Sequence, residues 1–351
     1  MSTNTGVTLN INKKADRVWS ILIIGYGVVG GNLYAELSKG KNLNIDIVDK
    51  YKPECNTTTR GNKKYDIAFV CVDTPRTAET ACECREVANA IAENDAEVYV
   101  IKSTVLPGTT NGIRAGSGKR VVFSPEYYGG TQHCNNFDFP FTIIGGPKAD
   151  CKEVVQMLQN VYDARHQFRI TDSDTAELVK YMENAYLATK VSFCNQFFQI
   201  AEQIGVDYEE LRELFVLDER VDPAHTFVYR DKPYWESHCL DKDVPAIAEA
   251  FNAPFLREVI GFNDYCKERY RKQRSCKDAR MNCRHNINPI GPGTEAKPES
   301  EAKRLQPMGN VVVIGMNQGA GKIDPKLAKK ISREVHESFD AFLKTIVKDS
   351  E

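Results

Sequence analysis

A thiol, a lysine and two carboxylates lie together in one short stretch of the chain, Cys239-Leu240-Asp241-Lys242-Asp243. A thiolate is a nucleophile, a nearby cation favours thiolate over thiol, and a carboxylate can accept a proton. Alone, the stretch also fits an ordinary polar loop, so its chemistry depends on what the rest of the chain places beside it. Helical patterns occur on both sides, and we therefore expect these five residues in a connecting loop.

A lysine and an asparagine form a second pair of polar groups. Lys180 and Asn184 stand at positions i and i+4 of a long helical pattern, so they share one helix face. An ammonium and a carboxamide directed at one point can hold a substrate hydroxyl and later an oxyanion. On most helices such a pair is solvated surface, so this pair also needs a structural context.

A glycine-rich turn follows the first apolar run and precedes a helical pattern; it reads Gly25-Tyr26-Gly27-Val28-Val29-Gly30. Gly25 permits a tight bend, Gly27 lets the backbone approach a pyrophosphate, and Gly30 allows the helix to pack closely on the strand. The helix N-terminus then faces the phosphates. Asp49 ends the next predicted strand, where a carboxylate binds the adenosine ribose and repels a 2′-phosphate. The sequence therefore predicts a dinucleotide site and favours NAD over NADP.

Polar side chains also follow three later apolar runs. The carboxyl ends of parallel strands face the ligand crevice of an open sheet. Thr74 and Thr104 are therefore candidates to contact the ribose or the nicotinamide, and Glu126 ends the following strand at the same rim. Thr-Pro and Ser-Thr pairs also cap strands and helices without binding anything, so both interpretations stay open here.

These residues require a scaffold of alternating strands and helices. Apolar runs of strand length occupy residues 19–24, 45–48, 67–72, 98–101, 121–123 and 141–144, with helical patterns between several of them. This alternation predicts an α/β fold with a doubly wound parallel sheet. Helix-capping residues at 171–174 then precede about thirty residues without Gly or Pro, which predicts one long helix. Further helices are expected at 208–217 and 244–272, with a break at Pro254.

We divide the chain accordingly into four parts. Residues 17–170 are expected to form a Rossmann domain that binds the dinucleotide, and residues 171–275 a central helical domain with the Cys239 loop. Residues 276–309, rich in Pro, Gly, Glu and Lys, are interpreted as a linker or mobile loop. Residues 310–351 are expected to form a small C-terminal αβ piece.

Composition excludes several classes of protein. The 351 residues carry a formal net charge of −2, so we expect neither nucleic acid nor an anionic membrane as a partner. Eleven cysteines, odd in number and scattered, are typical of reduced thiols in a cytoplasmic protein. We find no signal peptide and no apolar run of the ~20 residues that a membrane helix needs. Cys276, Cys283 and His285 lack a fourth ligand at suitable spacing, so no metal site is expected.

Taken together, the motifs and their order resemble the UDP-glucose/GDP-mannose dehydrogenase family over residues 18 to about 272. The resemblance rests on the glycine turn, the strand ends at 72–75, 101–105 and 124–126, the helix sequence at 176–190, and residues 239–243. It implies an NAD-dependent four-electron oxidation of a nucleotide sugar's primary alcohol to a carboxylate. UDP-glucose is the favoured substrate and UDP-glucuronate, used in polysaccharide biosynthesis, the product.

The resemblance also implies catalytic roles. Cys239 would carry a thiohemiacetal and then a thioester, and Asp243 would position or activate water. Lys180 and Asn184 would stabilise oxyanions. The reaction would thereby keep the aldehyde bound until a second NAD accepts the second hydride.

Two further roles follow from the same resemblance. Thr104 and Glu126 would serve the proton transfers through ordered water. The residues implied to contact NAD are those of the glycine turn, Gly25, Tyr26, Gly27, Val28, Val29 and Gly30, together with Asp49, Val72, Thr74, Thr104 and Lys242.

The Cys239 loop departs from the family pattern. Where the family has glycines before the cysteine and a proline after it, this chain has Glu236, Ser237 and Asp241. Glycines let a loop lie against a sugar, so Glu236 and Ser237 should alter the fit of a substrate. The charge of Asp241 should raise the pKa of the thiol.

Two other departures concern the rest of the chain. Gly130 stands where the family has a second carboxylate. The family's third domain, which grips the nucleotide, needs on the order of 100 residues or more. Only residues 311–351 are available for it, so we expect a reduced remnant of that domain.

Two alternative functions remain open at this stage. The chain could be a non-catalytic descendant that binds NAD or a partner. It could also be a two-electron hydroxyacid dehydrogenase of the 6-phosphogluconate type, which pairs a similar NAD domain with a helix carrying lysine and asparagine. In either case the long helix, with its apolar face, favours a homodimer.

Overall fold

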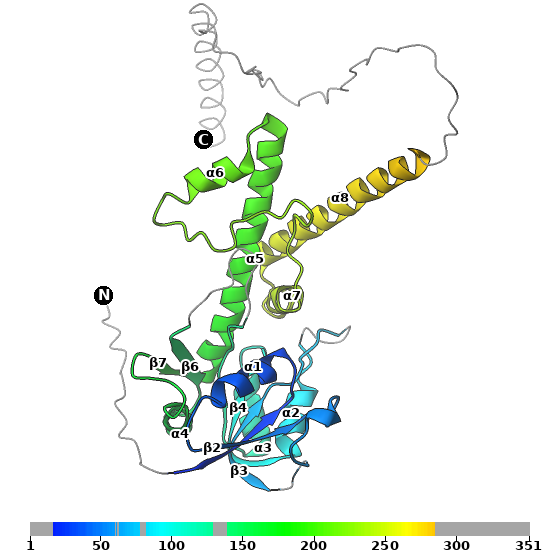
Figure 1. The fold of residues 1–351 in the computed structure, drawn as a ribbon. Helices are drawn as coiled ribbons and strands as arrows, with labels where there is room; N and C mark the ends of the chain where they lie inside the picture. Colours follow the sequence, from blue (N-terminus) through cyan, green and yellow to red (C-terminus); the bar gives the residue numbers. More distant parts are fainter. Residues whose placement is uncertain (1–16, 60, 62, 78–81, 129–138, 285–351) are drawn as a thin grey trace, which may run out of the picture. The chain divides into compact units, whose positions relative to one another are not determined.

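The computed structural model describes residues 17–59, 61, 63–77, 82–128 and 139–284 (Figure 1). The expected C-terminal piece at 310–351, the part of the expected linker after residue 284, and Gly130 lie outside the described residues.

The N-terminal half of the described chain forms one seven-stranded sheet with the strand order β2-β1-β3-β4-β5-β6-β7. Its strands are β1 (Trp19–Ile24), β2 (Leu43–Val48), β3 (Lys64–Val70), β4 (Asp95–Ile101), β5 (Val121–Phe123), β6 (Phe141–Gly145) and β7 (Gln167–Thr171). Each of the six predicted runs coincides with a strand, except that β3 ends two residues before the run at 67–72 does. The doubly wound α/β fold is confirmed. The crossover from β2 back to β3 makes β1 the strand beside the topological switch point, where such folds bind ligands.

The sheet differs in two details from the six apolar runs and the parallel pairing that the sequence indicates. Strands β5 and β6 pair antiparallel through Phe123 and Gly145, whereas the other neighbours pair parallel. Strand β7 was not predicted, because it contributes only the partly buried Phe168 and Ile170 to the core and is otherwise polar. A strand at the edge of a sheet needs fewer apolar residues than one in its centre.

Helices cover both faces of the sheet: α1 (Val28–Leu37), α2 (Arg85–Ala92), α3 (Thr109–Ser117) and α4 (Lys148–Leu158). Strand β1 shows why two layers are needed. Ile21 and Ile23 belong to the core that includes residues of α1 and α4, whereas Leu22 and Ile24 belong to the core that includes residues of α2. Burying such side chains contributes about 1.5–3 kcal/mol each. The glycine turn therefore follows one of the most firmly held strands.

The predicted long helix is confirmed as α5 (Ser173–Ile204). Its N-cap is Asp172, whose carboxylate accepts hydrogen bonds from the amide (2.8 Å) and hydroxyl (2.7 Å) of Thr175. Glu177 on the same helix is fully buried and accepts hydrogen bonds from the amides of Gly108 (2.7 Å) and Thr110 (2.8 Å). This carboxylate fixes the helix against the loop that follows β4, and so sets the positions of residues one and two turns further on.

The remaining helices pack along α5 (Figure 1): α6 (Tyr208–Phe215), α7 (Leu240–Ala250) and α8 (Pro254–Arg284). Helix α8 continues past Cys276 to Arg284, so residues 276–284 of the predicted linker are helical. The reason is local, because residues 276–284 contain no Gly or Pro that would stop a helix.

The expectation that Cys239 to Asp243 form a loop was also wrong. Cys239 is the N-cap of α7, and the next four residues are its first turn. Ser237 and Asp241 fix this start reciprocally: the Ser237 hydroxyl accepts a hydrogen bond from the Leu240 amide (3.0 Å), and the Asp241 carboxylate accepts one from the Ser237 amide (2.7 Å). Carboxylates in a first turn also favour the helix dipole. The two residues that replace glycine and proline therefore form a helix cap.

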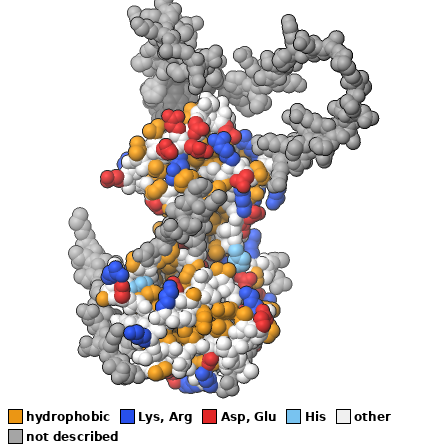
Figure 2. Space-filling view, in the orientation of Figure 1, with side chains coloured by type: hydrophobic (Ala, Val, Ile, Leu, Met, Phe, Trp, Pro, Cys, Tyr) orange, Lys and Arg blue, Asp and Glu red, His pale blue; other side chains and the backbone are white. Residues whose placement is uncertain are grey.

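Acidic and basic side chains are interspersed on the face of the molecule shown in Figure 2, in keeping with the nearly balanced charge of the chain. Among the described residues, no helix combines the length and the apolar character needed to span a bilayer.

Candidate functional site

Two glycines of the turn after β1 have no room for a side chain. Gly25 adopts a φ of +92°, and a Cβ there would lie 2.6 Å from the carbonyl oxygen of Cys71. A Cβ on Gly30 would lie 2.0 Å from the carbonyl oxygen of Gly25. The turn and the first turn of α1 are therefore in direct backbone contact, and glycine is required at both positions.

Gly27 differs, because the space beside it is open. It is the N-cap of α1, no side chain caps the helix there, and a Cβ would meet nothing within 4 Å. The next residue, Val28, is 77% exposed although it is apolar. Uncapped amides at a helix N-terminus with free space in front of them fit the pyrophosphate of a dinucleotide.

Asp49 lies beside the glycine turn and is held by backbone amides. One carboxylate oxygen accepts a hydrogen bond from the Tyr26 amide (2.6 Å), and the other accepts from the amides of Tyr51 (2.7 Å) and Lys52 (2.8 Å). Burial by itself raises the pKa of Asp49, but these three donors outweigh it and the pKa is lowered. The carboxylate is thus ionised and fixed where it would meet a ribose and repel a 2′-phosphate.

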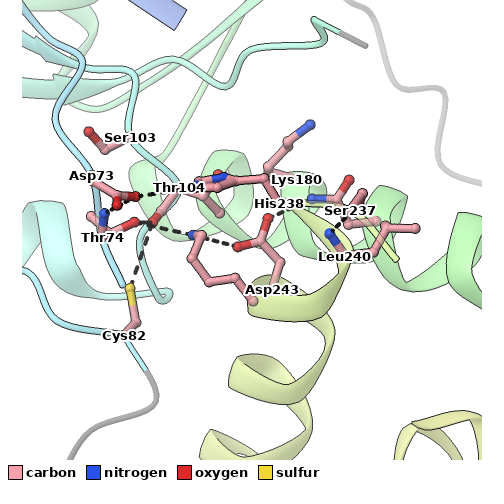
Figure 3. Close-up of polar contacts among 12 residues, drawn as sticks. Asp73, Thr74, Cys82, Ser103, Thr104, Lys180, Ser237, His238, Leu240 and Asp243 are labelled. Atoms are coloured by element: carbon pink, nitrogen blue, oxygen red, sulfur yellow. Dashed lines mark hydrogen bonds and ion pairs between the residues drawn. The ribbon is translucent and has the colours of Figure 1, made fainter. Parts of the chain in front are cut away.

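The rim at the ends of β3 and β4 is joined to α7 by a chain of polar contacts (Figure 3). Thr74 is buried; its hydroxyl donates to the carbonyl of Thr104 (2.7 Å) and accepts from the ammonium of Lys242 (3.2 Å). The carbonyl of Val72 accepts a hydrogen bond from the Ser103 hydroxyl (2.6 Å). The Thr74 hydroxyl therefore already has partners inside the protein, and it positions Lys242 at the rim.

Asp243 is the most deeply buried carboxylate near Cys239, with 1% exposure. One oxygen accepts a hydrogen bond from the Asn184 amide (2.7 Å), which joins α7 to α5. The other lies 2.6 Å from the ammonium of Lys242 but is not aligned for a hydrogen bond. This second oxygen thus keeps the capacity to accept a proton or a hydrogen bond.

Lys180 is buried between two carboxylates. Its ammonium lies 3.1 Å from Glu183 and 3.7 Å from Glu126, whose other oxygen accepts a hydrogen bond from the Tyr128 amide (2.7 Å). Burial lowers the pKa of Lys180, but Glu126 and Glu183 outweigh it and the pKa is raised. The lysine is therefore a cation at neutral pH, as oxyanion stabilisation requires.

Sequence reasoning missed Glu183 and Lys102. Glu183 stands at i+3 from Lys180, and that spacing alone would have indicated a contact. Lys102, at the end of β4, is buried and donates to the carbonyl of Pro125 (3.0 Å), so it holds the segment that carries Glu126. Burial lowers the pKa of Lys102. A lysine directly after an apolar strand was the available signal.

Cys239, Lys180, Glu183 and Asn184 line one cavity of about 640 Å³, together with aromatic side chains that include Trp235. This volume suits a small organic ligand. The sequence-predicted lysine, asparagine and cysteine therefore face a common space, although they come from α5 and from the start of α7.

The pKa of the Cys239 thiol is raised, first by burial and then by Glu126 and Asp243, while Lys180 and Lys242 oppose the shift. Asp241 is not among these main influences, and its carboxylate is turned to Lys267 (2.7 Å). The thiol is therefore protonated at neutral pH, and attack by its sulfur needs a base.

Comparison with known proteins shows where this arrangement belongs. Residues 54–166 match the NAD binding domain of the UDP-glucose/GDP-mannose dehydrogenase family, and residues 174–265 match its central domain. The chain belongs to this family. The matched N-terminal domain also confirms NAD as the predicted cofactor. The glycine turn precedes the matched range, so its assignment stands on the geometry described above.

Several family members are similar over part of their length. GDP-mannose 6-dehydrogenase of Pseudomonas aeruginosa is 30% identical over 203 residues, which cover 52% of this chain and 46% of that protein. UDP-glucose 6-dehydrogenase of Rickettsia bellii is 31% identical over 212 residues, or 56% and 48% of the two chains. The matched part thus spans less than half of either relative.

Solved structures share the fold. A UDP-glucose dehydrogenase from Pyrobaculum islandicum superposes with a TM-score of 0.61 at 21% identity, covering 73% of this chain and 70% of that one. The UDP-N-acetyl-mannosamine dehydrogenase Cap5O from Staphylococcus aureus gives 0.54 at 18% identity, covering 70% and 68%. At sequence identities this low, the similarity establishes a shared fold and nothing about substrate.

Proposed function

We propose that the protein oxidises the primary alcohol of a nucleotide sugar to a carboxylate with NAD, and that UDP-glucose is the substrate, UDP-glucuronate the product. The observation that carries this proposal is the shared cavity, in which Cys239 of α7 faces the same space as Lys180 and Asn184 of α5. A thiol, an ammonium and a carboxamide around one carbon are what an alcohol needs to pass through an aldehyde to a thioester.

The glycine turn and Asp49 would hold NAD, which would supply the oxidant for both stages: one alcohol, one water and two NAD⁺ give one carboxylate, two NADH and three protons. In the first stage the substrate hydroxyl hydrogen-bonds to Lys180 or Asn184. Its proton leaves toward Glu126 through ordered water, with Thr104 at the same rim. Lys180 remains cationic throughout, because Glu126 and Glu183 hold its pKa high.

In the second stage the Cys239 sulfur adds to the aldehyde carbon and the thiol proton is lost. Asp243 is suited to accept it, since one carboxylate oxygen has no aligned donor. Lys180 and Asn184 stabilise the oxyanion of the thiohemiacetal, which then loses its hydride to become a thioester. Asp243 then passes the thiol proton to solvent and takes a proton from water. The resulting hydroxide attacks the thioester carbon and expels the Cys239 thiolate, and the carboxylic acid so formed gives its proton to that thiolate, which leaves the carboxylate and restores the thiol.

The same proposal includes a homodimer in the cytoplasm. An apolar groove of about 350 Å³ runs along α5 and the start of α8 and is lined by Leu178, Met182, Tyr186 and Phe255 among others. These side chains are exposed in the single chain, and a second copy of α5 would cover them. Sedimentation of wild-type protein and of a Met182→Glu variant tests this point: the dimer should dissociate in the variant.

The activity is tested by counting NADH per sugar oxidised over a panel of UDP and GDP sugars. Two NADH per sugar are expected with wild-type protein. A Cys239→Ala variant should lose activity by at least ~10³-fold while its NAD affinity is kept, because the cysteine acts only on the sugar carbon. Full activity in that variant contradicts the proposal, and one NADH per turnover without dependence on Cys239 favours the two-electron hydroxyacid reaction.

One observation favours the non-catalytic alternative, namely the raised pKa of the Cys239 thiol. NAD binding by wild-type protein, with no turnover of any sugar in the panel at pH values above that pKa, selects this alternative.

A further inference from the structure

A pair of cysteines lies outside the proposed reaction. Cys82 and Cys84 are separated by one residue in the connection between β3 and α2, and their sulfurs are 3.6 Å apart. No disulfide bond joins them. Cys82 is only 6% exposed, and Cys84 is partly exposed. Two thiols at this distance need to approach by about 1.5 Å to form a disulfide bond of ~2.05 Å.

Cys82 lies beside the hydrogen-bonded groups that position Lys242. The Cys82 sulfur lies 3.7 Å from the carbonyl oxygen of Thr104, and this carbonyl also accepts the Thr74 hydroxyl at 2.7 Å. Thr74 in turn accepts the Lys242 ammonium. Figure 3 shows the Cys82 sulfur directed at Thr104. The Cys82 sulfur thus contacts the same carbonyl group that holds Thr74 at the rim of the NAD crevice.

The surroundings also favour ionisation of one thiol of the pair. A hydrogen bond from Cys84 is the largest influence on Cys82, burial opposes it, and the Lys242 cation adds to it, so the pKa of Cys82 is lowered to about 6. The pKa of Cys84 is raised, because its proton is shared with the neighbouring sulfur. One sulfur is therefore a nucleophile at neutral pH while the other keeps a proton, the arrangement found in reactive dithiols.

We propose that Cys82 and Cys84 form a reversible redox site that a peroxide closes to a disulfide, and that its closure weakens NAD binding. The Cys82 sulfur attacks one peroxide oxygen, which gives a sulfenic acid and, for hydrogen peroxide, one water. The Cys84 sulfur then attacks the Cys82 sulfur and expels the hydroxyl as a second water. Overall, two thiols lose two hydrogens and two electrons, and the peroxide is reduced to two waters.

The disulfide acts on the cofactor site by moving the Cys82 sulfur and removing its charge. The Cys82 thiolate lies close enough to Lys242 for each to influence the other, and a disulfide sulfur carries no charge. Closure of the S–S bond also draws that sulfur toward Cys84 and away from the Thr104 carbonyl, which accepts the Thr74 hydroxyl. The position of Lys242 therefore loses support. We expect the dissociation constant of NAD to rise about threefold, the size of effect that the loss of one polar contact produces.

The experiment uses the full chain carrying Cys239→Ser, so that the pocket cysteine takes no part. Protein treated with hydrogen peroxide is alkylated without reduction and digested with trypsin. Residues 77–85 are released as one peptide, since Arg76 and Arg85 flank it, and it holds no other cysteine. The expected result is the loss of two hydrogens from this peptide, reversed by dithiothreitol, together with the threefold weaker NAD binding measured by calorimetry.

Cys84→Ser and Cys82→Ser, each added to the same protein, are the matched variants, and Cys55→Ser is the control that keeps both thiols. In the two former variants no linked peptide should form, and peroxide should not produce the threefold loss of NAD affinity that dithiothreitol reverses. An alkylated, unlinked peptide after peroxide treatment overturns the proposal. So does a linked peptide with unchanged NAD affinity. Neither outcome depends on sugar oxidation, so the proposed function is tested separately.

Discussion

The NAD crevice and the Cys239 cavity are built in opposite ways. The crevice is made by backbone: Gly25 and Gly30 bring two turns into contact, and Gly27 leaves the first amides of α1 open. The cavity is made by charged side chains on different elements, with Lys180 and Asp243 both nearly inaccessible to water. A backbone site depends on the absence of side chains, whereas the cavity depends on the balance of a few buried charges.

This contrast teaches which changes each region tolerates. In the crevice a single added methyl group is enough to disrupt the backbone contacts, and Asp49 is the one side chain whose charge we expect to affect NAD binding. In the cavity the shapes can stay while one lost charge shifts the pKa of its neighbours. Substitutions that change only volume, or only charge, should therefore separate the two regions.

The largest effect is expected at Gly30. A Gly30→Ala variant places a Cβ 2.0 Å from the Gly25 carbonyl, a backbone atom that cannot move without opening the turn. We expect a loss of about 3 kcal/mol or more in the free energy of unfolding, and no measurable NAD binding. Denaturant unfolding and calorimetry with NAD measure both.

Gly31→Ala is the matched control, since the neighbouring helical glycine has nothing within 4 Å of its added Cβ. Alanine should stabilise the helix there by roughly 0.5–1 kcal/mol and leave NAD affinity unchanged. Equal behaviour of the two variants contradicts the idea that backbone contact builds the crevice.

The same contrast explains what the sequence could predict. The crevice follows from local order, because a strand, three glycines, a helix and Asp49 are close in the chain and each acts on its neighbours. The long helix was equally predictable from its capping residue and from the absence of Gly and Pro. The antiparallel β5–β6 pair and the edge strand β7 were not, since they depend on sheet pairing rather than on their own composition.

The cavity could be predicted only in part. Cys239, Lys180 and Asn184 were candidates because a family resemblance connected them, while their spacing in sequence says nothing of a shared cavity. The sequence predicted that Asp241 raises the pKa of the Cys239 thiol, but the Asp241 carboxylate is paired with Lys267. Distances between elements decide such electrostatic effects, and no local pattern contains them.

A smaller effect is expected at Asn184, whose amide is the hydrogen-bond donor to buried Asp243. Asn184→Ala leaves a carboxylate oxygen without that donor, at a cost of about 1–3 kcal/mol in the free energy of unfolding. Asn184→Asp should cost more, because two carboxylates then face each other.

Asn111→Ala is the control: its amide donates to Asp174 in an exposed pair (2.9 Å), and its removal should cost less than ~0.5 kcal/mol. Similar losses at both sites mean that burial of Asp243 does not govern the cavity.

The smallest effect, and the one most specific to charge, is expected from Glu183→Gln, which preserves volume. Glu126 and Glu183 raise the pKa of Lys180 against burial, so removing one of these charges lowers that pKa. The fraction of cationic Lys180 then falls at a lower pH, and the alkaline limb of the rate of sugar oxidation should move to lower pH while the rate on the plateau changes little. Rates measured between pH 7 and 11 give this limb, with Glu202→Gln, an exposed carboxylate further along α5, as the control. If the alkaline limb stays in place or moves to higher pH, Glu183 is not a charge partner of a catalytic Lys180. A shift of the same size in Glu202→Gln assigns the effect to the net charge of α5 instead.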